Sequence, residues 1–268
     1  MSTSASRWTA ALPEGVLVLH EGASAWVDAV CRRVEGLALP ASATACLAVA
    51  SGVAQAGRNV VVDLPGSARL SALRASMSLP FSGAGVVLRV PWGSHLVWLD
   101  APCIGLLADA GVRVVVPSSL DALQDCVAAA FTRPGLTVVL EHRALADAEP
   151  AAAAPADVAA AVAVCLLHLG PAHACYEAVE ALAAEGIAAG VVDAGELPLS
   201  GQAIGAVQRH GRPVFVCSDP SAGPPALAAL AASDAFWHLH AQPRWAPAET
   251  EAIVAAAKRA AADLQGVV

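Results

Sequence analysis

The feature that most constrains this chain is the alternation of short valine-rich runs with longer alanine- and leucine-rich segments of helical period. Continuous apolar runs of about four to eight residues are typical of strands buried on both faces, and the intervening helices predict a parallel sheet. The expected strands are Val16–Leu19, Val60–Leu64, Val86–Val90, Val112–Val116, Thr137–Glu141, Val162–Leu167, Ala188–Asp193, Val214–Cys217 and Ala235–His240. The expected helices are Thr44–Ala56, Ala68–Met77, Ala101–Ala110, Leu120–Phe131, Ala172–Glu185, Gly201–His210 and Ala248–Leu264, with Ser119 and Asp121 at the cap of the fourth. The pattern predicts the α/β class with doubly wound sheets.

Two domains are expected in the 268 residues. The segment Ala146–Asp157 contains alanines, two prolines and three acids, which is the composition of a linker. We therefore predict one domain over residues 1–147, a linker over 148–158 and a smaller α/β domain over 159–268.

Composition excludes several classes of partner. Charged residues make up 14% and hydrophobic residues 57%, but no apolar run reaches the roughly 20 residues of a membrane helix. The net charge of −8, without a Lys/Arg cluster, argues against nucleic-acid binding. The N-terminus lacks the pattern of a secretory signal, and the seven cysteines are odd in number and form no C-x-x-C pair, so a cytoplasmic protein with reduced thiols is expected.

Four segments, in this order, carry a resemblance to known enzymes: ATACLAVASGVAQAGRNVVVDL (Ala43–Leu64), VVLRVPWG (Val86–Gly93), the stretch Gly111–Leu145, and HACYEAVEALAAEGIAAGVVDAGELPLS (His173–Ser200). The chain resembles the transketolase and 2-oxoacid dehydrogenase beta-subunit family of thiamine-diphosphate enzymes. The resemblance implies a pyrimidine-binding domain followed by a transketolase C-terminal-type domain. The active-site motifs depart from the family pattern.

The resemblance also implies a partner. In this family a Gly-Asp-Gly turn in a third unit positions Mg²⁺ on the diphosphate, and no Gly-Asp-Gly occurs in this sequence. A complete thiamine-diphosphate site therefore requires a separate alpha-like subunit, and an α2β2-like heteromer or a dimer is expected. No metal ligand is assigned to this chain.

The position of the activating glutamate is altered. In the family this residue hydrogen-bonds the pyrimidine ring, lies in a Pro-x-Ser-Glu stretch and precedes a helix glycine by nine residues. Counting back from Gly52 leads to Ala43 at the end of the Pro40–Ala43 frame, and alanine can neither donate, accept nor titrate. Glu21 matches an acidic residue of an earlier family stretch, and is a candidate catalytic carboxylate or a solvated charge at a strand end.

Two further site elements differ from the family. Where the family has aromatic rings that stack on the pyrimidine, this chain has Gly66 and Arg69, the latter either an anion or stacking contact or a plain exposed arginine. The substrate-facing histidine of the family aligns with Trp98. His95, three residues earlier, is the candidate catalytic histidine or an ordinary loop residue.

Other polar positions favour structural roles. Glu141–Arg143 matches a Leu-Glu-His-Lys stretch of the family and is interpreted as domain-junction structure. His238 and His240 would share one face of a strand, and two histidines without a third ligand are usually structural. Cys103 is expected to be buried in a helix.

Three hypotheses follow. The chain is a beta-type subunit of a two-subunit enzyme that transfers a two-carbon ketol or acyl unit, with an acyl-carrier or lipoyl protein as a candidate acceptor. Alternatively, it is a catalytically degenerate structural or regulatory subunit that assembles with an active paralogue. In the third hypothesis it is a small-molecule binding protein that uses the crevice at the carboxyl ends of its strands.

Overall fold

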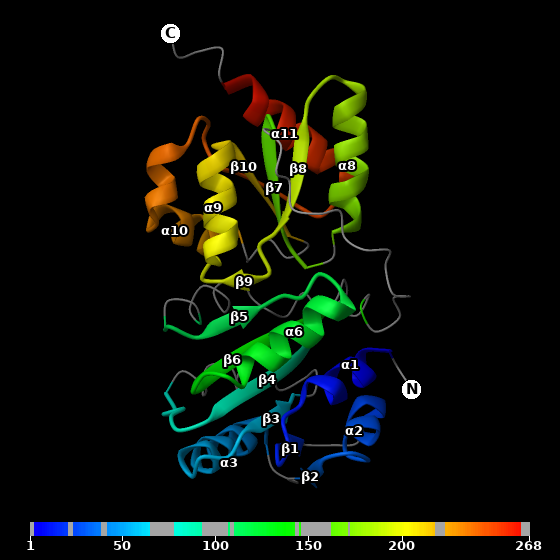
Figure 1. Cartoon of the computed structure of the whole chain (residues 1–268), viewed down its shortest axis with the longest axis vertical. Helices are drawn as coiled ribbons and strands as arrows, with labels where there is room; N and C mark the ends of the chain where they lie inside the picture. Colours follow the sequence, from blue (N-terminus) through cyan, green and yellow to red (C-terminus); the bar gives the residue numbers. More distant parts are fainter. Residues whose placement is uncertain are drawn as a thin grey trace. The chain divides into compact units, whose positions relative to one another are not determined.

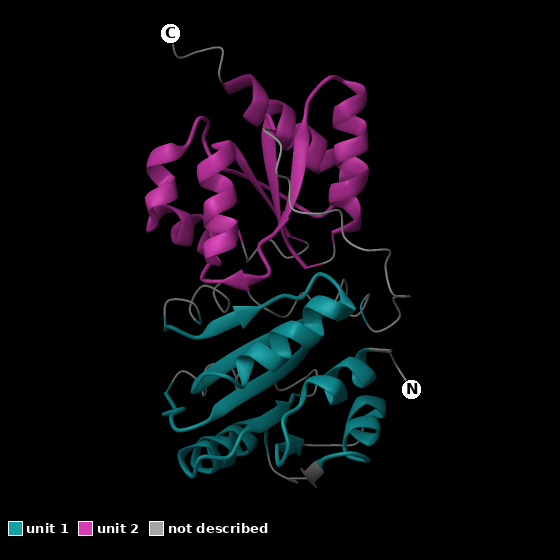
Figure 2. Cartoon of the chain, in the orientation of Figure 1, with its two compact units in different colours: residues 1–151 teal, residues 152–268 magenta. Residues whose placement is uncertain are grey.

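The computed structural model describes residues 3–20, 24–38, 42–64, 78–92, 107, 110–142, 145, 162–170, 172–217 and 223–263. The chain divides into two compact units, Met1–Ala151 and Ala152–Val268 (Figure 2). The predicted linker, residues 148–158, lies outside the described residues. Each unit is considered by itself below.

Unit 1 is built on a parallel sheet (Figure 1). Its strands follow the order β2-β1-β3-β4-β6-β5, so the chain turns to one side of β1 to form β2 and then crosses to the other side to form β3. Their bounds are β1 Leu17–His20, β2 Glu35–Ala38, β3 Val60–Asp63, β4 Gly85–Trp92, β5 Arg113–Val115 and β6 Gly135–His142. The reversal of direction between β1 and β3 is the topological switch point at which open α/β sheets form a crevice.

Helices cover both faces of this sheet. Helices α1 (Thr3–Ala11), α2 (Ala25–Val30) and α6 (Leu120–Ala130) contribute to one core cluster with the strand residues Val61, Val87 and Val139. The alternate strand residues Val60, Val62, Val86 and Leu88 are also buried, and they point to the opposite face because side chains alternate along a strand. Helix α3 (Ala43–Gln55) contacts β1, β3 and β4 and lies outside the first cluster.

Unit 2 is also built on a parallel sheet, whose strands follow the order β11-β10-β7-β8. Its strands are β7 Val164–Leu169, β8 Ala189–Asp193, β10 Pro213–Cys217 and β11 Arg244–Ala246, together with the two-residue β9 Glu196–Leu197. Helices α8 (His173–Ala184) and α11 (Thr250–Ala262) share one core cluster. Helices α9 (Gly201–His210) and α10 (Gly223–Ala231) contact the sheet outside that cluster, so the doubly wound α/β class is confirmed.

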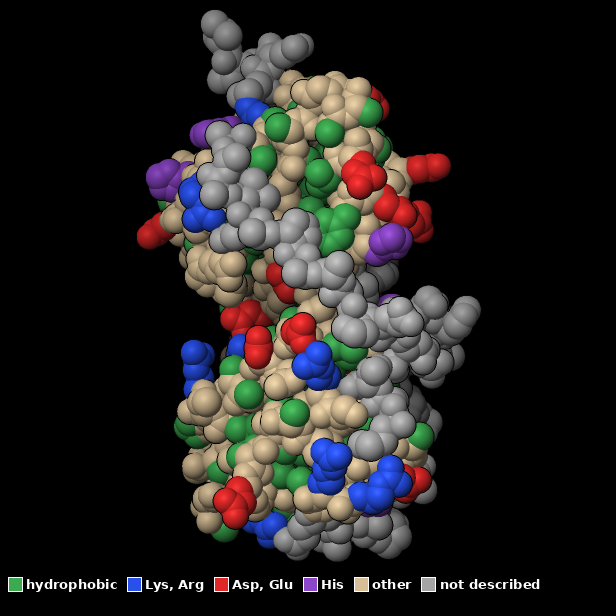
Figure 3. Space-filling view, turned by 45° about the vertical axis from the view of Figure 1, so that its right-hand side comes forward, with side chains coloured by type: hydrophobic (Ala, Val, Ile, Leu, Met, Phe, Trp, Pro, Cys, Tyr) green, Lys and Arg blue, Asp and Glu red, His purple; other side chains and the backbone are tan. Residues whose placement is uncertain are grey.

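Polar contacts join α8 to α11 at their exposed edges. Lys258 Nζ lies 2.6 Å from Glu185 Oε1, and the Thr250 hydroxyl donates to Glu177 Oε2 at 2.5 Å. In Figure 3, acidic side chains gather toward the right of unit 2, the side on which Figure 1 draws α8. Exposed pairs of this kind contribute little, about 0–1 kcal/mol each, so the apolar cluster beneath them dominates the packing of the two helices.

Eight of the nine expected strands are confirmed to within two or three residues, but the strand expected at Ala235–His240 is wrong. A 3-10 helix, η2 (Asp234–His238), occupies this segment, and the last strand is β11. The alternation of this segment is typical of a strand, yet only Ala235 is buried and the aromatic side chains after it face outward. His238 and His240 therefore do not share a strand face.

Helix predictions agree where the chain is described. The expected cap at Ser119 is confirmed, because its side chain accepts a hydrogen bond from the backbone N–H of Ala122. The helix expected at Ala68–Met77 and most of that expected at Ala101–Ala110, including Cys103, lie outside the described residues. No helix of the described part is long and apolar enough to cross a membrane.

Among the described residues, the cysteines are not in disulfides: Cys31, Cys46, Cys126, Cys165, Cys175 and Cys217. Cys175 lies on the buried side of α8, and burial raises the pKa of its thiol to about 12. The reactive species is the thiolate, and at pH 8 this pKa leaves a fraction of about 10⁻⁴ ionised.

We expect iodoacetamide at pH 8 to modify Cys175 in the unfolded chain but not in the native one, as read by peptide mass spectrometry; rapid native labelling would contradict the burial.

Two glycines provide a matched test of the packing of α3. Gly83 has φ +88°, and a Cβ there would lie 2.5 Å from the carbonyl oxygen of Ala54, whereas a Cβ at Gly52, inside α3, meets nothing within 4 Å. We expect Gly83→Ala to destabilise the protein by about 1–3 kcal/mol and Gly52→Ala to stabilise it by about 0.5–1 kcal/mol. Urea unfolding of both variants measures the difference, and equal effects would contradict the described contact.

Candidate functional site

The candidate site of unit 1 is the edge at which its parallel strands end. Strands β1, β3, β4 and β6 end at His20, Asp63, Trp92 and His142. Four parallel strands place their carboxyl ends at one edge of a sheet, where ligands of open α/β sheets bind. The segments that follow these ends in the sequence contain the predicted site residues.

Most predicted site residues lie outside the part of the chain that the structure describes. These are Glu21, which follows β1; Gly66 and Arg69, which follow β3; and His95 and Trp98, which follow β4. Their assignments stay predictions.

Ala43 is the one predicted site residue that is described. It is the first residue of α3, the helix that follows β2, and its side chain is 1% exposed. The N-cap residue Ser42 makes no side-chain hydrogen bond to the helix, and the first turn contains no acidic residue. The position therefore presents a buried methyl group at a helix N-terminus and no group that can exchange a proton.

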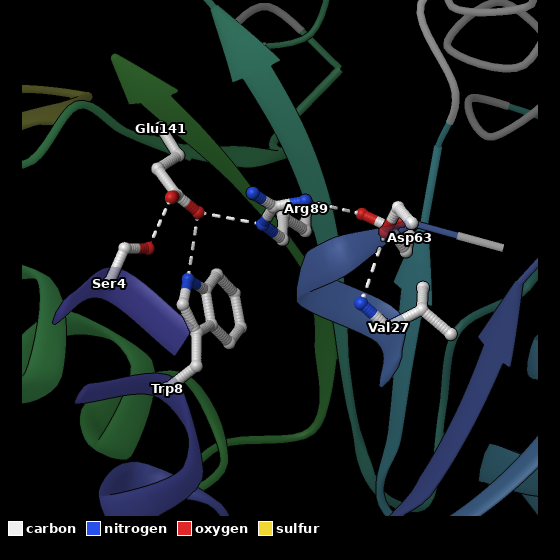
Figure 4. A network of polar contacts seen from close by, with 7 residues as sticks. Ser4, Trp8, Val27, Asp63, Arg89 and Glu141 are labelled. Atoms are coloured by element: carbon white, nitrogen blue, oxygen red, sulfur yellow. Dashed lines mark hydrogen bonds and ion pairs between the residues drawn. The ribbon is translucent and has the colours of Figure 1, made fainter. Parts of the chain in front are cut away.

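A buried ionic network joins residues of β3, β4 and β6 next to this edge (Figure 4). The sequence interpretation did not predict it. Arg89 Nη1 donates to Asp63 Oδ1 at 2.7 Å, and Arg89 Nε donates to Glu141 Oε2 at 2.7 Å. From α1, Trp8 Nε1 donates to the same Oε2 at 2.8 Å, and the Ser4 hydroxyl donates to Oε1. Glu141 is thereby bonded within unit 1 to two residues of α1 that lie 133 and 137 positions earlier in the sequence. The domain-junction interpretation of Glu141–Arg143 stays a prediction.

Strand register explains why these charges meet. Asp63 and Arg89 are direct partners across β3 and β4, while Glu141 lies two residues beyond Val139, the partner of Arg89 on β6. Positions two apart on a strand point to the same face. All three charges therefore point to the face covered by α1 and α2.

One aromatic ring covers the guanidinium. The Arg89 Cζ lies 4.4 Å from the ring centroid of Trp26, and Trp26 meets Trp8 edge-on at 5.4 Å. Burial alone would lower the pKa of Arg89. Glu141 and Asp63 raise this pKa through their negative charges and their hydrogen bonds, and together they outweigh burial, so the pKa lies above its ordinary value. Arg89 is a permanent cation in the fold, with its Nε and Nη1 donors engaged by the two carboxylates.

Neighbouring groups at the edge have shifted pKa values. Burial lowers the pKa of His142, which directly follows Glu141. Burial, followed by the negative charges of Asp28 and Asp63, raises the pKa of the Cys31 thiol. Neutral imidazole and neutral thiol are therefore the favoured forms at pH 7, and neither is an activated nucleophile.

Unit 2 has its own polar group at the carboxyl ends of β7 and β8. His168 Nδ1 lies 2.9 Å from the carbonyl oxygen of Gly170 and 3.9 Å from Asp193 Oδ1. Burial, then Asp193 and Cys175, raises the pKa of Tyr176. Among the described residues, no group of three or more His, Cys, Asp or Glu side chains is arranged to hold a metal ion.

The buried network yields a stability prediction. Arg89→Met leaves two buried carboxylates without their cation, so we expect a loss of about 3–5 kcal/mol. Arg7→Met is the matched control on α1, because Arg7 pairs with the exposed Asp121 at 2.8 Å and its loss costs at most about 1 kcal/mol. Urea unfolding measures both; similar losses would show that the network contributes no more than a surface pair.

Comparison with known proteins found similar chains among solved structures only. No family model matches the chain, and no curated protein matches it. A structure described as a split-gene transketolase, inactive beta4 tetramer, matches with a TM-score of 0.78 at 17% identity, over 97% of this chain and 98% of that chain.

A second structure is more distant. The 2-oxoglutarate:ferredoxin oxidoreductase from Magnetococcus marinus, with 2-oxoglutarate, coenzyme A and succinyl-CoA bound, matches with a TM-score of 0.64 at 11% identity, over 97% of this chain and 65% of that chain. The chain thus spans about two thirds of this second protein. The predicted resemblance is confirmed at the level of fold: both units, in their order, have the fold of the split-gene transketolase beta chain.

Proposed function

We propose that this chain is the beta-type subunit, equivalent to the C-terminal half, of a two-subunit thiamine-diphosphate-dependent enzyme similar to transketolase and 2-oxoacid dehydrogenases. The observation that carries the proposal is the end-to-end fold match with a beta chain encoded by a split gene. A match over 97% of this chain and 98% of the other includes the order of both units. Such a chain contributes only part of a cofactor site.

The companion is an alpha-like subunit that holds the diphosphate and its Mg²⁺. The absence of a Gly-Asp-Gly turn from the full sequence supports this division. We propose an α2β2-like assembly in which the carboxyl edge of unit 1 faces the cofactor. The inactive state named for the beta4 tetramer of the split-gene transketolase supports inactivity of a beta-type chain by itself.

The described residues do not fit the usual activation of the cofactor. Ala43 presents a buried methyl group where the family resemblance places a carboxylate, so the chain supplies no hydrogen bond to the pyrimidine at this position. We therefore assign no proton transfer through the cofactor to this chain. Glu21 and His95 are proposed as the groups nearest the reacting centre, and Gly66, Arg69 and Trp98 as altered cofactor-side positions.

The proposed reaction is transfer of a two-carbon ketol or acyl unit. An acyl-carrier or lipoyl protein is the proposed acceptor. The fold supports this class of reaction only by analogy, since function depends on the individual groups of a site.

The buried methyl group of Ala43 favours a second candidate function. A subunit that retains the fold and lacks the activating carboxylate would stabilise or regulate an active paralogue. General acid–base groups typically contribute about 10²–10⁴ in rate, so their loss is compatible with assembly but not with ordinary turnover.

Cofactor titration separates the two functions. The chain is co-expressed with the companion that contains the Gly-Asp-Gly turn, and thiamine diphosphate with Mg²⁺ is titrated into the complex by calorimetry. The enzyme proposal expects saturable binding by the wild-type complex and none by the isolated chain. A complex that forms but binds no cofactor would favour the second function, and absence of a complex with the companion would overturn the enzyme proposal.

Substitution at Ala43 gives the sharper arm of this test. If the chain is degenerate, Ala43→Glu should tighten binding at least about tenfold, equivalent to 1.4 kcal/mol, because it restores a carboxylate that can hydrogen-bond the pyrimidine. Ala43→Gln is the matched control, with similar volume and no charge. Equal effects of Glu and Gln would contradict a role for the carboxylate.

A further inference from the structure

The amino edge of the sheet of unit 1 gathers arginines that lie far apart in the sequence. Strand register aligns the starts of β2, β1, β3, β4 and β6, whose first residues pair in parallel to within one position. The segments that lead into these strands therefore follow one another along this edge, at the opposite end of the sheet from the candidate site. The arginines of this edge are Arg32 and Arg33 before β2, Arg58 before β3, Arg133 before β6 and Arg113 at the start of β5. We call these five residues the arginine rim.

The rim presents positive charge to solvent. Arg32, Arg33 and Arg133 are exposed, and their side chains form no ion pair or hydrogen bond within the part of the chain that the structure describes. Arg58 is half-buried, and its Nε donates to the carbonyl oxygen of Gly15 at 2.8 Å, which holds it against the segment before β1.

Few acids balance this charge. Among the side chains that the structure describes, the acids nearest to the rim in sequence are Glu14, before β1, and Asp28, on α2. The whole chain has a net charge of −8, so the rim is a local reversal of the overall sign. A surface of this kind attracts a partner whose potential is complementary to it.

The residue types of the rim favour a protein as that partner. All five cations are arginine, and Lys258 on α11 is the only lysine of the sequence. Arginine is enriched and lysine depleted in protein interfaces, and the planar guanidinium pairs with a carboxylate through two parallel hydrogen bonds. Partly buried apolar side chains lie beside the exposed arginines in the sequence: Cys31, Val34 and Phe131. The negative net charge of the chain opposes nucleic acid and anionic membranes, whose charge extends beyond the rim.

We propose that the arginine rim docks an acidic segment of a partner protein, whose carboxylates pair with Arg32, Arg33 and Arg133. Strands lie about 4.8 Å apart, so the four spacings from β2 to β6 extend about 19 Å, which an extended segment of about six residues spans. The rim and the candidate site lie at opposite ends of the same strands. The docking contact therefore does not use the cofactor and does not rest on the proposed function.

Fluorescence anisotropy of the full chain alone tests the docking. The probe is a labelled oligoglutamate peptide of about 12 residues, which is longer than the rim. We expect saturable binding at low salt that weakens as the ionic strength rises, because exposed ion pairs are screened. A peptide that shows no saturable binding at low salt would overturn the proposal.

Removal of charge from both ends of the rim tests whether it acts as one surface. The double variant Arg33→Gln, Arg133→Gln should weaken peptide binding about fivefold, because each exposed ion pair contributes modestly. The matched control is Arg209→Gln, Arg259→Gln, which removes two exposed arginines from α9 and α11 of unit 2 and changes the net charge equally. Its affinity should stay within about twofold of wild type. Equal losses in the two double variants would show that net charge alone attracts the peptide, and urea unfolding confirms that both are folded.

Two other polyanions test the class of partner. Oligothymidylate of the same length and phosphatidylserine vesicles are titrated at the same ionic strength, and we expect the glutamate peptide to bind most tightly. Tighter binding of either polyanion that is lost in Arg33→Gln, Arg133→Gln would assign the rim to a phosphate-bearing partner and overturn the proposal. Peptide binding by a chain that forms no complex with the companion subunit would leave this inference standing and the proposed enzyme refuted.

Discussion

The interaction on which unit 1 depends is the pairing of a buried guanidinium with two buried carboxylates. Arg89 on β4 bonds to Asp63 on β3 and Glu141 on β6, and Glu141 also accepts from α1. A buried charge is tolerated only when it is paired and hydrogen-bonded, so each of these elements must be in place for the others to be stable. The network thus couples an N-terminal helix to three central strands of the sheet.

The network lies at the strand ends that precede the predicted site residues in the sequence. Asp63 and Glu141 lie at or next to the ends of their strands, and the segments that follow β3 and β4 contain Gly66, Arg69, His95 and Trp98. The network fixes the strand ends from which those segments begin. Substitution in the segments after the strands therefore leaves the supporting charges intact, and a fold can outlast an altered active centre.

Sequence reasoning succeeded where burial alone decides structure. The runs VVVD and VVLRV predict buried strands because no other element accommodates consecutive valines so well. It failed at Glu35–Ala38, whose Gly and Ala have low strand propensity and whose strand β2 exists through pairing with β1. It also failed at η2, where alternation predicted a strand and tertiary contacts with α9 and α10 prevail. Arg89 offered a signal that could have been used: a charge inside a buried strand requires a partner on a neighbouring strand.

The candidate site resists prediction for a different physical reason. Packing tolerates exchange of apolar residues of similar volume, so a fold persists at 17% identity, as the match with the split-gene transketolase beta chain shows. Chemistry depends on single groups, and the buried methyl group of Ala43 can neither donate, accept nor titrate. The fold can therefore be assigned from the pattern of the whole chain, whereas the reaction must be established at the few positions along the sheet edge.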